Sequence, residues 1–344
     1  NFKMKKKLVI ITNEKFYFRD KNYFCDHVAE KTLPDGLKNK FEVTIVGRNT
    51  SIKRAHQLET SNIENYKFLT SYLFAILKKI LKGDYKFLIL SISPYTFFAS
   101  LLFIFFKSKP LVYLRSNGYE EYKSILGFYG PIIYGIMFKI VSKIGFFISC
   151  RDHILKGKPG HLVYPSELTN NWKLNIVQPD YENVKLLYVG RIKVEKGIFS
   201  LIELLNSLSN QISLTIVGET KQSKINLKKD NISVFPIENN EKKLIRYYDD
   251  HSIFILPSFT EGHPMVLLEA LARMRPVIIF DEIKHVIGDK KGIFVSERNA
   301  DSLGKVIEYV KNNRNKIYEE MKQNKLPTKE NFLIKFNNLI STLN

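Results

Sequence analysis

Residues 253–274 read IFILPSFTEGHPMVLLEALARM. The apolar run 253–257 is typical of a buried parallel strand, and the polar residues behind it predict a loop. Pro264 suits the first turn of a helix, and residues 265–274 are mostly good helix formers that stop before Pro276. A helix that begins beyond the carboxyl end of a strand presents free backbone N–H groups, which bind diphosphates. This stretch therefore predicts a strand, a turn and a helix of an α/β fold, with an anion site at the turn.

Two glutamates stand on either side of the predicted helix start. Glu261 precedes the helix, and Glu269 lies about one and a half turns into it, roughly 7 Å further along. Ionised carboxylates accept hydrogen bonds from the vicinal hydroxyls of a sugar or a ribose. The spacing therefore suits two hydroxylated groups bound on either side of a diphosphate. The alternative is a loop residue and an exposed helix residue that bind nothing.

A second stretch carries two cations. Residues 186–190 read LLYVG, a strand pattern, and RIKVEKG follows before an amphipathic run over 198–208. Arg191 at the strand end and Lys196 at the helix start should face the same crevice as Glu261, because parallel strands share their carboxyl edge. Fixed cations there would neutralise a leaving diphosphate. The alternative is a solvated basic turn.

Together these residues resemble the donor site of a known enzyme family. Gly190-Arg191 with Lys196-Gly197, followed some seventy residues later by Glu261-Gly-x-Pro and Glu269, resembles the family-4 retaining glycosyltransferases of the GT-B fold. The resemblance is specific over about residues 184–300 and only architectural before them. It implies two Rossmann-like parallel-sheet domains facing across a cleft, and a hexosyltransferase that retains anomeric configuration.

The resemblance also implies roles for single residues. The family's equivalents of Arg191 and Lys196 contact the diphosphate, that of Glu261 contacts the transferred sugar, and that of Glu269 holds the ribose diol. We take Glu261, Arg191 and Lys196 as the catalytic candidates. Backbone contacts to the donor are expected from Gly190, Gly262, His263, Pro264, Met265 and Val266, and contacts to the base from Ile237. His263 stands where the family often has an aromatic residue, so packing or capping is its expected role.

Strands and helices alternate twice along the chain, which predicts two parallel sheets with helices on both faces. The predicted strands are 7–12, 41–46, 87–92, 110–115, 145–149 and 161–164, then 186–190, 212–218, 231–236, 253–256, 276–280 and 292–295. We predict four parts: an N-terminal acceptor-binding Rossmann-like domain (1–165), a linker (166–183), a C-terminal nucleotide-sugar-binding Rossmann-like domain (184–326), and a C-terminal helix (327–344) able to cross back to the first domain.

Acceptor-side residues are expected after the strand at 110–115. Arg115 and Asn117 open the loop that follows it, and the alternative for Arg115 is an ion pair with Glu120 or Glu121. The family often has a glycine-rich turn after its first strand, whereas residues 12–16 here form a predicted turn without glycine. No histidine lies in the Arg115 loop, so the resemblance supports the donor site better than the acceptor chemistry.

Positive charge is concentrated in the first half of the chain. Residues 1–165 hold 27 Lys and Arg against 12 Asp and Glu, which gives +15 of the formal net charge of +19. Segment 67–86 has the pattern of a basic amphipathic helix, so an anionic membrane surface is an expected partner. The alternative is a core helix with a solvated lysine end, and residues 131–143 can be interpreted in both ways too. Nucleic acid is a weaker candidate, because the basic residues are dispersed and no nucleic-acid-binding motif is present.

The longest apolar stretch, 95–106, has 12 residues against the roughly 20 that span a bilayer, so we expect a buried crossover helix there. The apolar run 8–12 is too short for a secretion signal and predicts a first strand. Cys25 and Cys150 have no metal-ligand spacing, which favours reduced thiols. We expect a cytoplasmic enzyme, either free or peripheral on the inner face of the membrane.

The sequence contains no Asp-x-Asp motif, so we expect no metal and no other cofactor, with diphosphate neutralisation left to Arg191, Lys196 and helix amides. The predicted function is transfer of a sugar from a nucleotide sugar to a glycolipid, or to a lipid-linked or surface glycan. UDP-sugars are the first choice of donor and GDP-mannose the second. The alternatives are glycosylation of DNA, epimerisation of a nucleotide sugar, and a non-catalytic binding paralogue.

Overall fold

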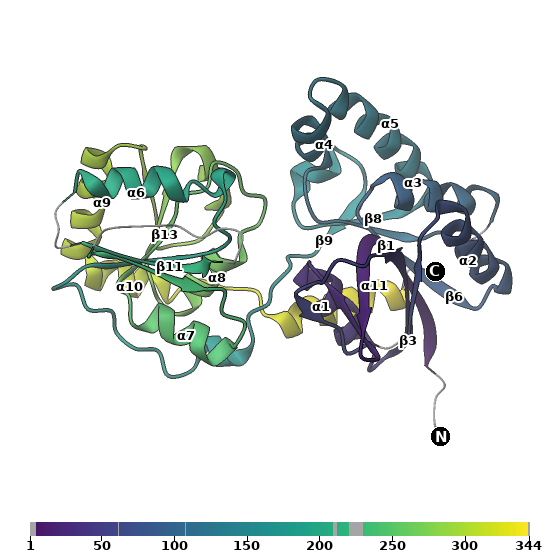
Figure 1. Ribbon diagram of the computed structural model, residues 1–344, viewed down its shortest axis with the longest axis horizontal. Helices are drawn as coiled ribbons and strands as arrows, with labels where there is room; N and C mark the ends of the chain where they lie inside the picture. Colours follow the sequence, from purple (N-terminus) through teal and green to yellow (C-terminus); the bar gives the residue numbers. More distant parts are fainter. Residues whose placement is uncertain (1–4, 61, 107, 209–211, 220–229, 343–344) are drawn as a thin grey trace. The chain divides into compact units, whose positions relative to one another are not determined.

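The computed structural model describes residues 5–60, 62–106, 108–208, 212–219 and 230–342. The chain divides into two compact units (Figure 1). The first unit holds residues 1–165 and 329–344, and the second holds residues 166–328. Each unit has a largely parallel sheet between helices, so the α/β fold predicted from the sequence is confirmed.

The first unit is built on seven parallel strands in the order β5-β3-β1-β6-β7-β8-β9. Their bounds are β1 Lys6–Arg19, β3 Phe41–Asn49, β5 Ile63–Tyr66, β6 Tyr85–Leu90, β7 Leu111–Leu114, β8 Phe146–Ser149 and β9 Gly160–Leu162. Two short strands, β2 (Asn22–Cys25) and β4 (His56–Gln57), extend it in antiparallel fashion. The central strands are apolar on both sides because helices cover both faces.

The first strand differs from its prediction. Residues 12–16 were expected to form a turn, but β1 continues through a register irregularity between Ile11 and Lys15 and ends at Arg19. Phe16 is fully buried, which holds this extension against the core. The turn comes at Asp20 and Lys21, whose φ angles of +50° and +62° produce a hairpin with β2.

The helices of the first unit are α1 Val28–Leu37, α2 Leu69–Lys82, α3 Pro94–Leu101, α4 Gly118–Leu126, α5 Tyr129–Ile144 and α11 Lys329–Thr342, with short 3₁₀ turns η1 (Leu102–Phe105) and η2 (Asp152–Leu155). Helix α11 returns from the end of the chain to this unit, where the Phe336 ring meets Tyr113 edge-on at 4.7 Å (Figure 1). Among the described residues, none of the helices combines the length and apolar character needed to cross a bilayer.

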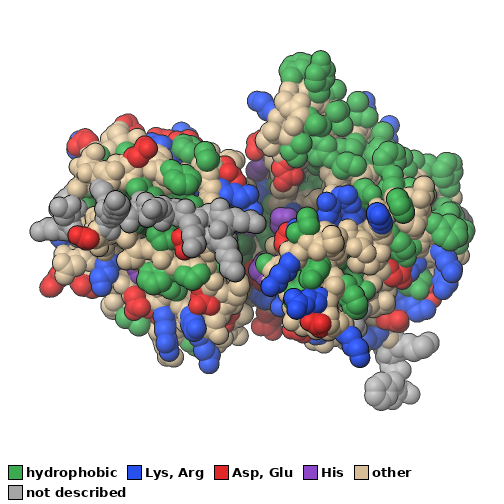
Figure 2. Space-filling model, in the orientation of Figure 1, with side chains coloured by type: hydrophobic (Ala, Val, Ile, Leu, Met, Phe, Trp, Pro, Cys, Tyr) green, Lys and Arg blue, Asp and Glu red, His purple; other side chains and the backbone are tan. Residues whose placement is uncertain are grey.

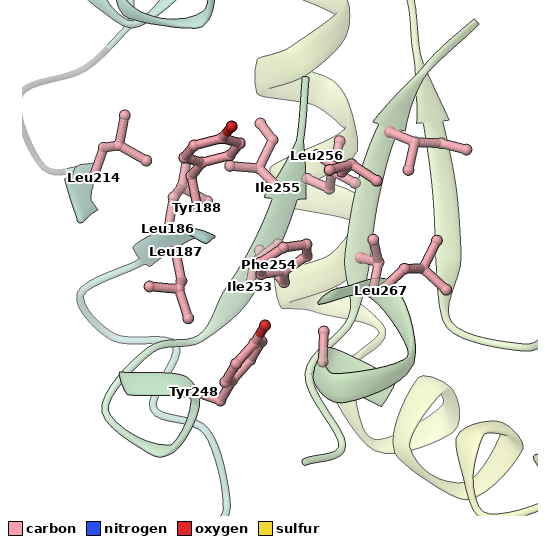
Figure 3. Close-up of a cluster of buried hydrophobic side chains, with 14 of the residues drawn as sticks. Leu186, Leu187, Tyr188, Leu214, Tyr248, Ile253, Phe254, Ile255, Leu256 and Leu267 are labelled. Carbon is pink, nitrogen blue, oxygen red and sulfur yellow. The ribbon is translucent and has the colours of Figure 1, made fainter. Parts of the chain in front are cut away.

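The second unit has six parallel strands in the order β12-β11-β10-β13-β14-β15. These are β10 Lys185–Val189, β11 Ser213–Glu219, β12 Ile232–Pro236, β13 Ile253–Leu256, β14 Val277–Phe280 and β15 Ile293–Ser296. The helices are α6 Ile198–Asn206, α7 Glu241–Asp249, α8 Met265–Ala272, α9 Ala300–Asn312 and α10 Arg314–Met321, with 3₁₀ turns η3 (Asn170–Lys173), η4 (Val194–Lys196) and η5 (Asp281–Val286). Figure 3 shows the side chains of β10 and β13 packed side by side at its centre.

The segment predicted as a linker, 166–183, packs on the second unit instead of joining two domains freely. Trp172 is buried there, and the guanidinium of buried Arg273 donates to the carbonyls of Trp172, Leu174 and Asn175 at 3.2, 2.7 and 2.9 Å. Asp249 neutralises that guanidinium with two hydrogen bonds of 2.8 Å. The polar composition of the segment is typical of a linker. Its contact with the second unit was missed because Arg273, which binds its carbonyls, lies about a hundred residues away in the sequence.

Candidate active site

The turn between β10 and α6 approaches the end of β13 closely, and glycine makes this possible. Gly197 has φ +66°, and a Cβ there would lie 1.9 Å from the carbonyl oxygen of Pro257. Gly218 has φ +151°, and a Cβ added there would lie 1.8 Å from the carbonyl oxygen of Gly190. Only residues without a side chain fit this packing. It brings the start of α6 against the loop after β13.

Lys196 and Glu261 form an ion pair at that contact. Lys196 Nζ lies 2.6 Å from Glu261 Oε1, and the same oxygen accepts a 2.7 Å hydrogen bond from Oγ of the fully buried Ser258. His285 Nε2 lies 2.7 Å from the main-chain oxygen of Glu261. Two independent contacts therefore fix the carboxylate, and a third fixes its backbone. Ser258 and His285 were not among the predicted site residues. The His285 contact joins two separate elements, whereas Ser258 lies only three positions before Glu261 in the same loop and was overlooked.

Arg191 leaves β10 with its side chain exposed, and its carbonyl accepts a 2.8 Å hydrogen bond from the buried hydroxyl of Tyr188. That bond fixes the backbone from which the side chain departs. The guanidinium can therefore move toward an anion while the Arg191 backbone stays in place. Burial raises the pKa of Tyr188, so this hydroxyl remains a donor at neutral pH.

Pro264 is the N-cap of α8, one residue before the helical turn in which it was predicted, and Met265 is the first helical residue. The amides of Met265 and Val266 belong to the first turn, where N–H groups have no helical partner. At Gly262 an added Cβ would meet nothing within 4 Å, so the backbone before the helix borders open space. His263, half-buried, completes this loop. The turn after β13 thus presents main-chain donors to the same edge as Lys196.

Glu269 is partly buried instead of lying on an exposed helix face. Its Oε2 accepts a 2.8 Å hydrogen bond from the hydroxyl of Tyr248, whose buried ring packs beside Phe254 (Figure 3). Burial raises the pKa of Glu269 to about 7, the Tyr248 hydrogen bond opposes this rise, and the charges of Glu167 and Glu241 add to it. A carboxyl group with this pKa is partly protonated at neutral pH, and it accepts hydrogen bonds from both hydroxyls of a diol only in its ionised form. Tyr248 was not predicted, because nothing in the local pattern of α7 links it to α8.

Ile237 follows the edge strand β12 and is exposed, and its N–H donates to the carbonyl of Glu219 at 3.2 Å. It therefore lies at the carboxyl end of a parallel strand, as Gly190 and the loop before α8 do. The predicted donor-site residues thus share one edge of one sheet. Lys196 contacts Glu261 directly, whereas Glu269 is held separately by Tyr248.

In the first unit, Arg115 forms an ion pair, but its partner is Glu30 and not Glu120 or Glu121 as the alternative prediction had it. Its guanidinium Nη2 lies 2.7 Å from Oε1 of Glu30 at the start of α1, and neither Glu120 nor Glu121 takes that place. Asn117 caps α4 by accepting from the Tyr119 N–H at 3.2 Å, and its amide donates to Glu120 at 2.8 Å. Asn117 therefore has a structural role in this arrangement.

Two carboxyl groups that the sequence analysis missed accompany Arg115. Glu30 is almost fully buried, and Glu14 on β1 has a pKa raised by burial and by the charge of Glu30, although a hydrogen bond from the Asp26 N–H opposes that rise. Glu14 was missed because residues 12–16 were predicted to be a turn, and Glu30 because its partner Arg115 lies 85 positions away in the sequence. The predicted acceptor-side residue Arg115 thus lies beside two carboxyl groups, Glu30 and Glu14.

Comparisons with known proteins find sequence similarity mainly in the second unit. Residues 173–326 match the family model described as Glycosyl transferases group 1. TuaC of Bacillus subtilis (strain 168), named for teichuronic acid biosynthesis, is 32% identical over 123 residues, which are 35% of this chain and 31% of TuaC. CapM of Staphylococcus aureus, a capsular polysaccharide biosynthesis glycosyltransferase, is 26% identical over 140 residues, 37% of this chain and 36% of CapM. The chain spans about a third of the length of these relatives in the alignments.

Solved structures show the fold of the whole chain. Alr3699/HepE of Anabaena, in complex with UDP, matches with a TM-score of 0.73 at 10% identity, covering 98% of this chain and all of that one. WaaG, a glycosyltransferase involved in lipopolysaccharide biosynthesis, matches with a TM-score of 0.65 at 15% identity over 97% of this chain and 100% of its own. The GT-B fold predicted from the sequence is confirmed. The match to the group 1 glycosyltransferase model covers residues 173–326, which are less than half of the chain. The family-4 retaining subclass stays a prediction.

Proposed function

We propose that this protein transfers a sugar from a nucleotide sugar to a glycan acceptor carried by a lipid. The observation that carries the proposal is the Lys196–Glu261 pair, fixed by Ser258 beside the start of α8. It places a cation, a carboxylate and main-chain donors at one sheet edge, which is the set that a sugar diphosphate requires. The group 1 domain match and the relatives named for surface polysaccharide synthesis support the same activity.

The ammonium of Lys196 has three N–H donors and uses one toward Glu261. The others can bind the diphosphate, together with Arg191 and the amides of Met265 and Val266. As the bond between the anomeric carbon and the phosphate oxygen breaks, negative charge grows on the leaving diphosphate and positive charge on the sugar. Groups fixed before the reaction stabilise this charge separation more than they stabilise the intact donor.

Glu261 has one oxygen engaged by Lys196 and Ser258, which leaves Oε2 to accept from a hydroxyl of the transferred sugar. This role orients the sugar and requires no covalent intermediate. Glu269 receives the ribose diol. We propose retention of anomeric configuration, with a donor phosphate oxygen taking the acceptor proton, and a reaction that needs no metal because cations of the chain neutralise the diphosphate. UDP-sugars are the preferred donors, followed by GDP-mannose. The proposed setting is cytoplasmic, at the inner face of a membrane.

The test is release of nucleoside diphosphate from a panel of UDP- and GDP-sugars, with and without a crude glycolipid extract. We expect release from one donor, stimulated by the extract and at least tenfold lower in Glu269→Ala. Glu308→Ala on the exposed side of α9 is the matched control and should leave the rate unchanged. Conversion of a donor into an isomer without acceptor would indicate an epimerase. Release that does not depend on Glu269 would contradict the donor site.

Donor binding should depend on pH through Glu269. The carboxyl group has a pKa of about 7 in the free protein, and a ribose diol binds to its ionised form. Affinity for the nucleoside diphosphate should therefore fall about tenfold from pH 8 to pH 6. Titration calorimetry across this range measures the slope. Glu269→Gln should bind more weakly at pH 8 and with a flatter profile.

Stability provides an independent measure of the same pKa. Because the folded pKa lies above the usual value of 4.5, the folded protein retains a proton that the unfolded chain has lost between these values. The contribution of Glu269 to stability is thus complete below pH 4.5 and is lost as the pH rises through 7. Glu269→Gln should be more stable than the parent at pH 8 by about 2–3 kcal/mol. Equal stability at pH 8 would mean that Glu269 is ionised at little cost.

A further inference from the structure

Large apolar side chains lie exposed on one face of the first unit, over α4 and α5 (Figure 2). They include Ile125, Leu126, Phe128, Tyr129, Ile132 and Ile136. Phe128 is 80% exposed and Ile125 is 74% exposed. A contiguous group of this kind marks an interaction surface, because a folded protein in water ordinarily scatters its exposed apolar side chains.

Helix α5 explains why the group faces outward. Tyr134, Met137 and Val141 bury one side of the helix in the core. Tyr129, Ile132 and Ile136 follow one another at helical spacing on the other side and remain exposed. A helix that is apolar all round belongs in an apolar environment on both sides. The outer side of α5 therefore requires a partner that the unit itself does not supply.

The hairpin of α4 and α5 presents these side chains on a fixed backbone. Gly130 packs so closely that an added Cβ would lie 2.0 Å from the carbonyl oxygen of Tyr122. The rings of Tyr119 and Tyr134 meet edge-on at 4.9 Å across the hairpin. The apolar tip formed by residues 125–129 is therefore held in place, so its exposure is a property of the packed fold.

A basic pocket lies further along the same helix. It measures about 420 Å³, and Lys109, Lys139 and Lys143 line it together with apolar side chains that include Ile104 and Ile140. Among the described residues that line it, none is acidic. Lys139 and Lys143 follow Ile136 by three and seven positions, so they lie on the outer side of α5. Apolar side chains with lysines at one end of the same surface match the layers of an anionic bilayer, acyl chains next to phosphates.

We propose that the α4–α5 hairpin docks the first unit on an anionic lipid bilayer, with Phe128, Ile132 and Ile136 among the acyl chains and the Lys109–Lys139–Lys143 pocket on lipid phosphates. This deepens the proposed function, because it assigns the bilayer of a lipid-linked acceptor to a defined face of the chain. It also replaces α2 as the main contact. The α2 segment also buries one side in the core, at Tyr72 and Ile76, and exposes Phe68, Phe74 and Leu81, so the experiment compares the two surfaces directly.

The experiment is co-sedimentation of the whole chain with vesicles of phosphatidylcholine, with and without phosphatidylglycerol. The triple variant Phe128→Ser, Ile132→Ser, Ile136→Ser should lower the partition coefficient on anionic vesicles at least tenfold. Its matched control is Phe68→Ser, Phe74→Ser, Leu81→Ser on the α2 segment, whose side chains are similarly exposed at 65%, 69% and 67%. This control should bind within twofold of the parent.

The double variant Lys139→Ala, Lys143→Ala should lose about fivefold per lysine on anionic vesicles and nothing on neutral ones. Lys242→Ala, Lys243→Ala on exposed α7 positions of the second unit is the control for charge. Glu269→Ala should bind vesicles as the parent does, so a failure of the donor site is distinguished from a failure of docking.

Three results would overturn the docking proposal. One is vesicle binding that survives the hairpin triple variant. Another is binding that is lost in the α2 variant alone. The third is a lipid-free dimer in sedimentation velocity that the hairpin variant dissociates while vesicle binding is absent, because a second copy of the chain would then be the partner of this face.

Discussion

Lys196→Met should lower kcat for sugar transfer by about 10²- to 10³-fold, the usual loss when one fixed donor is removed from a developing negative charge. Lys196 lies at the start of α6 with its side chain largely buried, 2.6 Å from Glu261. The substitution removes the cation proposed to face the leaving diphosphate, and it leaves the Glu261 carboxylate with the hydrogen bond from Ser258. The effect on kcat should exceed the effect on KM, because charge on the diphosphate grows during bond breakage.

The neighbouring lysine offers a matched control. Lys193 is half-exposed on the same turn and lies 3.8 Å from Glu195 in a surface pair. Lys193→Met should change kcat less than twofold, since exposed pairs contribute little. Lys196→Arg should retain part of the activity because it keeps the charge. Initial rates of nucleoside diphosphate release across donor concentrations provide both kinetic constants.

The pairing also predicts non-additive effects. Lys196 and Glu261 share one contact, so the double variant Lys196→Met, Glu261→Gln should be less impaired than the product of the two single losses. Additive losses, or a Lys196→Met enzyme within threefold of the parent, would show that the pair only orders the loop and does not face the leaving group.

The second unit was predicted from the sequence nearly strand by strand. Ile253–Leu256 and Val277–Phe280 are buried on both faces, and such strands appear in the sequence as uninterrupted apolar runs between polar loops. The positions of Arg191, Lys196 and Glu261 at one sheet edge followed from this, since parallel strands share the edge. The fold of this unit and the shared edge of the candidate donor-site residues therefore followed from local patterns.

The remaining features depend on contacts between residues far apart in the chain. The extension of β1 to Arg19 requires Phe16 to be buried, and nothing in residues 12–16 reveals the surface that buries it. Arg115 pairs with Glu30, which is 85 positions away, although two glutamates stand within six positions. Tyr248 on α7 determines the environment of Glu269 on α8. No short-range sequence pattern encodes such contacts. The Tyr248 contact also affects the pKa of Glu269, because its hydrogen bond opposes the rise that burial causes.

Arg273→Met should destabilise the second unit by about 3–5 kcal/mol, the typical cost of breaking a buried ion pair by removing one partner. Arg273 is 1% exposed and donates to Asp249 and to the carbonyls of Trp172, Leu174 and Asn175. Methionine fills part of the volume and satisfies none of these acceptors. Among the described residues, the carboxylate of Asp249 would keep Arg275 as its cationic partner, at 3.6 Å.

Trp172 is the only tryptophan in the chain and lies directly at this network, so its fluorescence reports the event locally. For a unit of this size the midpoint of thermal unfolding should fall by roughly 10 °C, at about 2–4 °C per kcal/mol. Arg246→Met on the exposed side of α7 is the matched control and should stay within about 0.5 kcal/mol of the parent. Equal midpoints for the two variants would show that the segment 166–183 is held by its apolar side chains alone.

The same substitution should affect donor binding, because the network continues toward the site. Trp172 meets Tyr248 edge-on at 5.4 Å, and Tyr248 donates to Glu269. If residues 172–175 detach when Arg273 is lost, Tyr248 loses the ring that packs against it and Glu269 gains water. The pKa of Glu269 should then fall toward its ordinary value, and the pH dependence of nucleotide affinity should weaken in Arg273→Met below its unfolding temperature. The buried Arg273 would thereby change the charge state of Glu269, the proposed ribose-binding residue, through Trp172 and Tyr248.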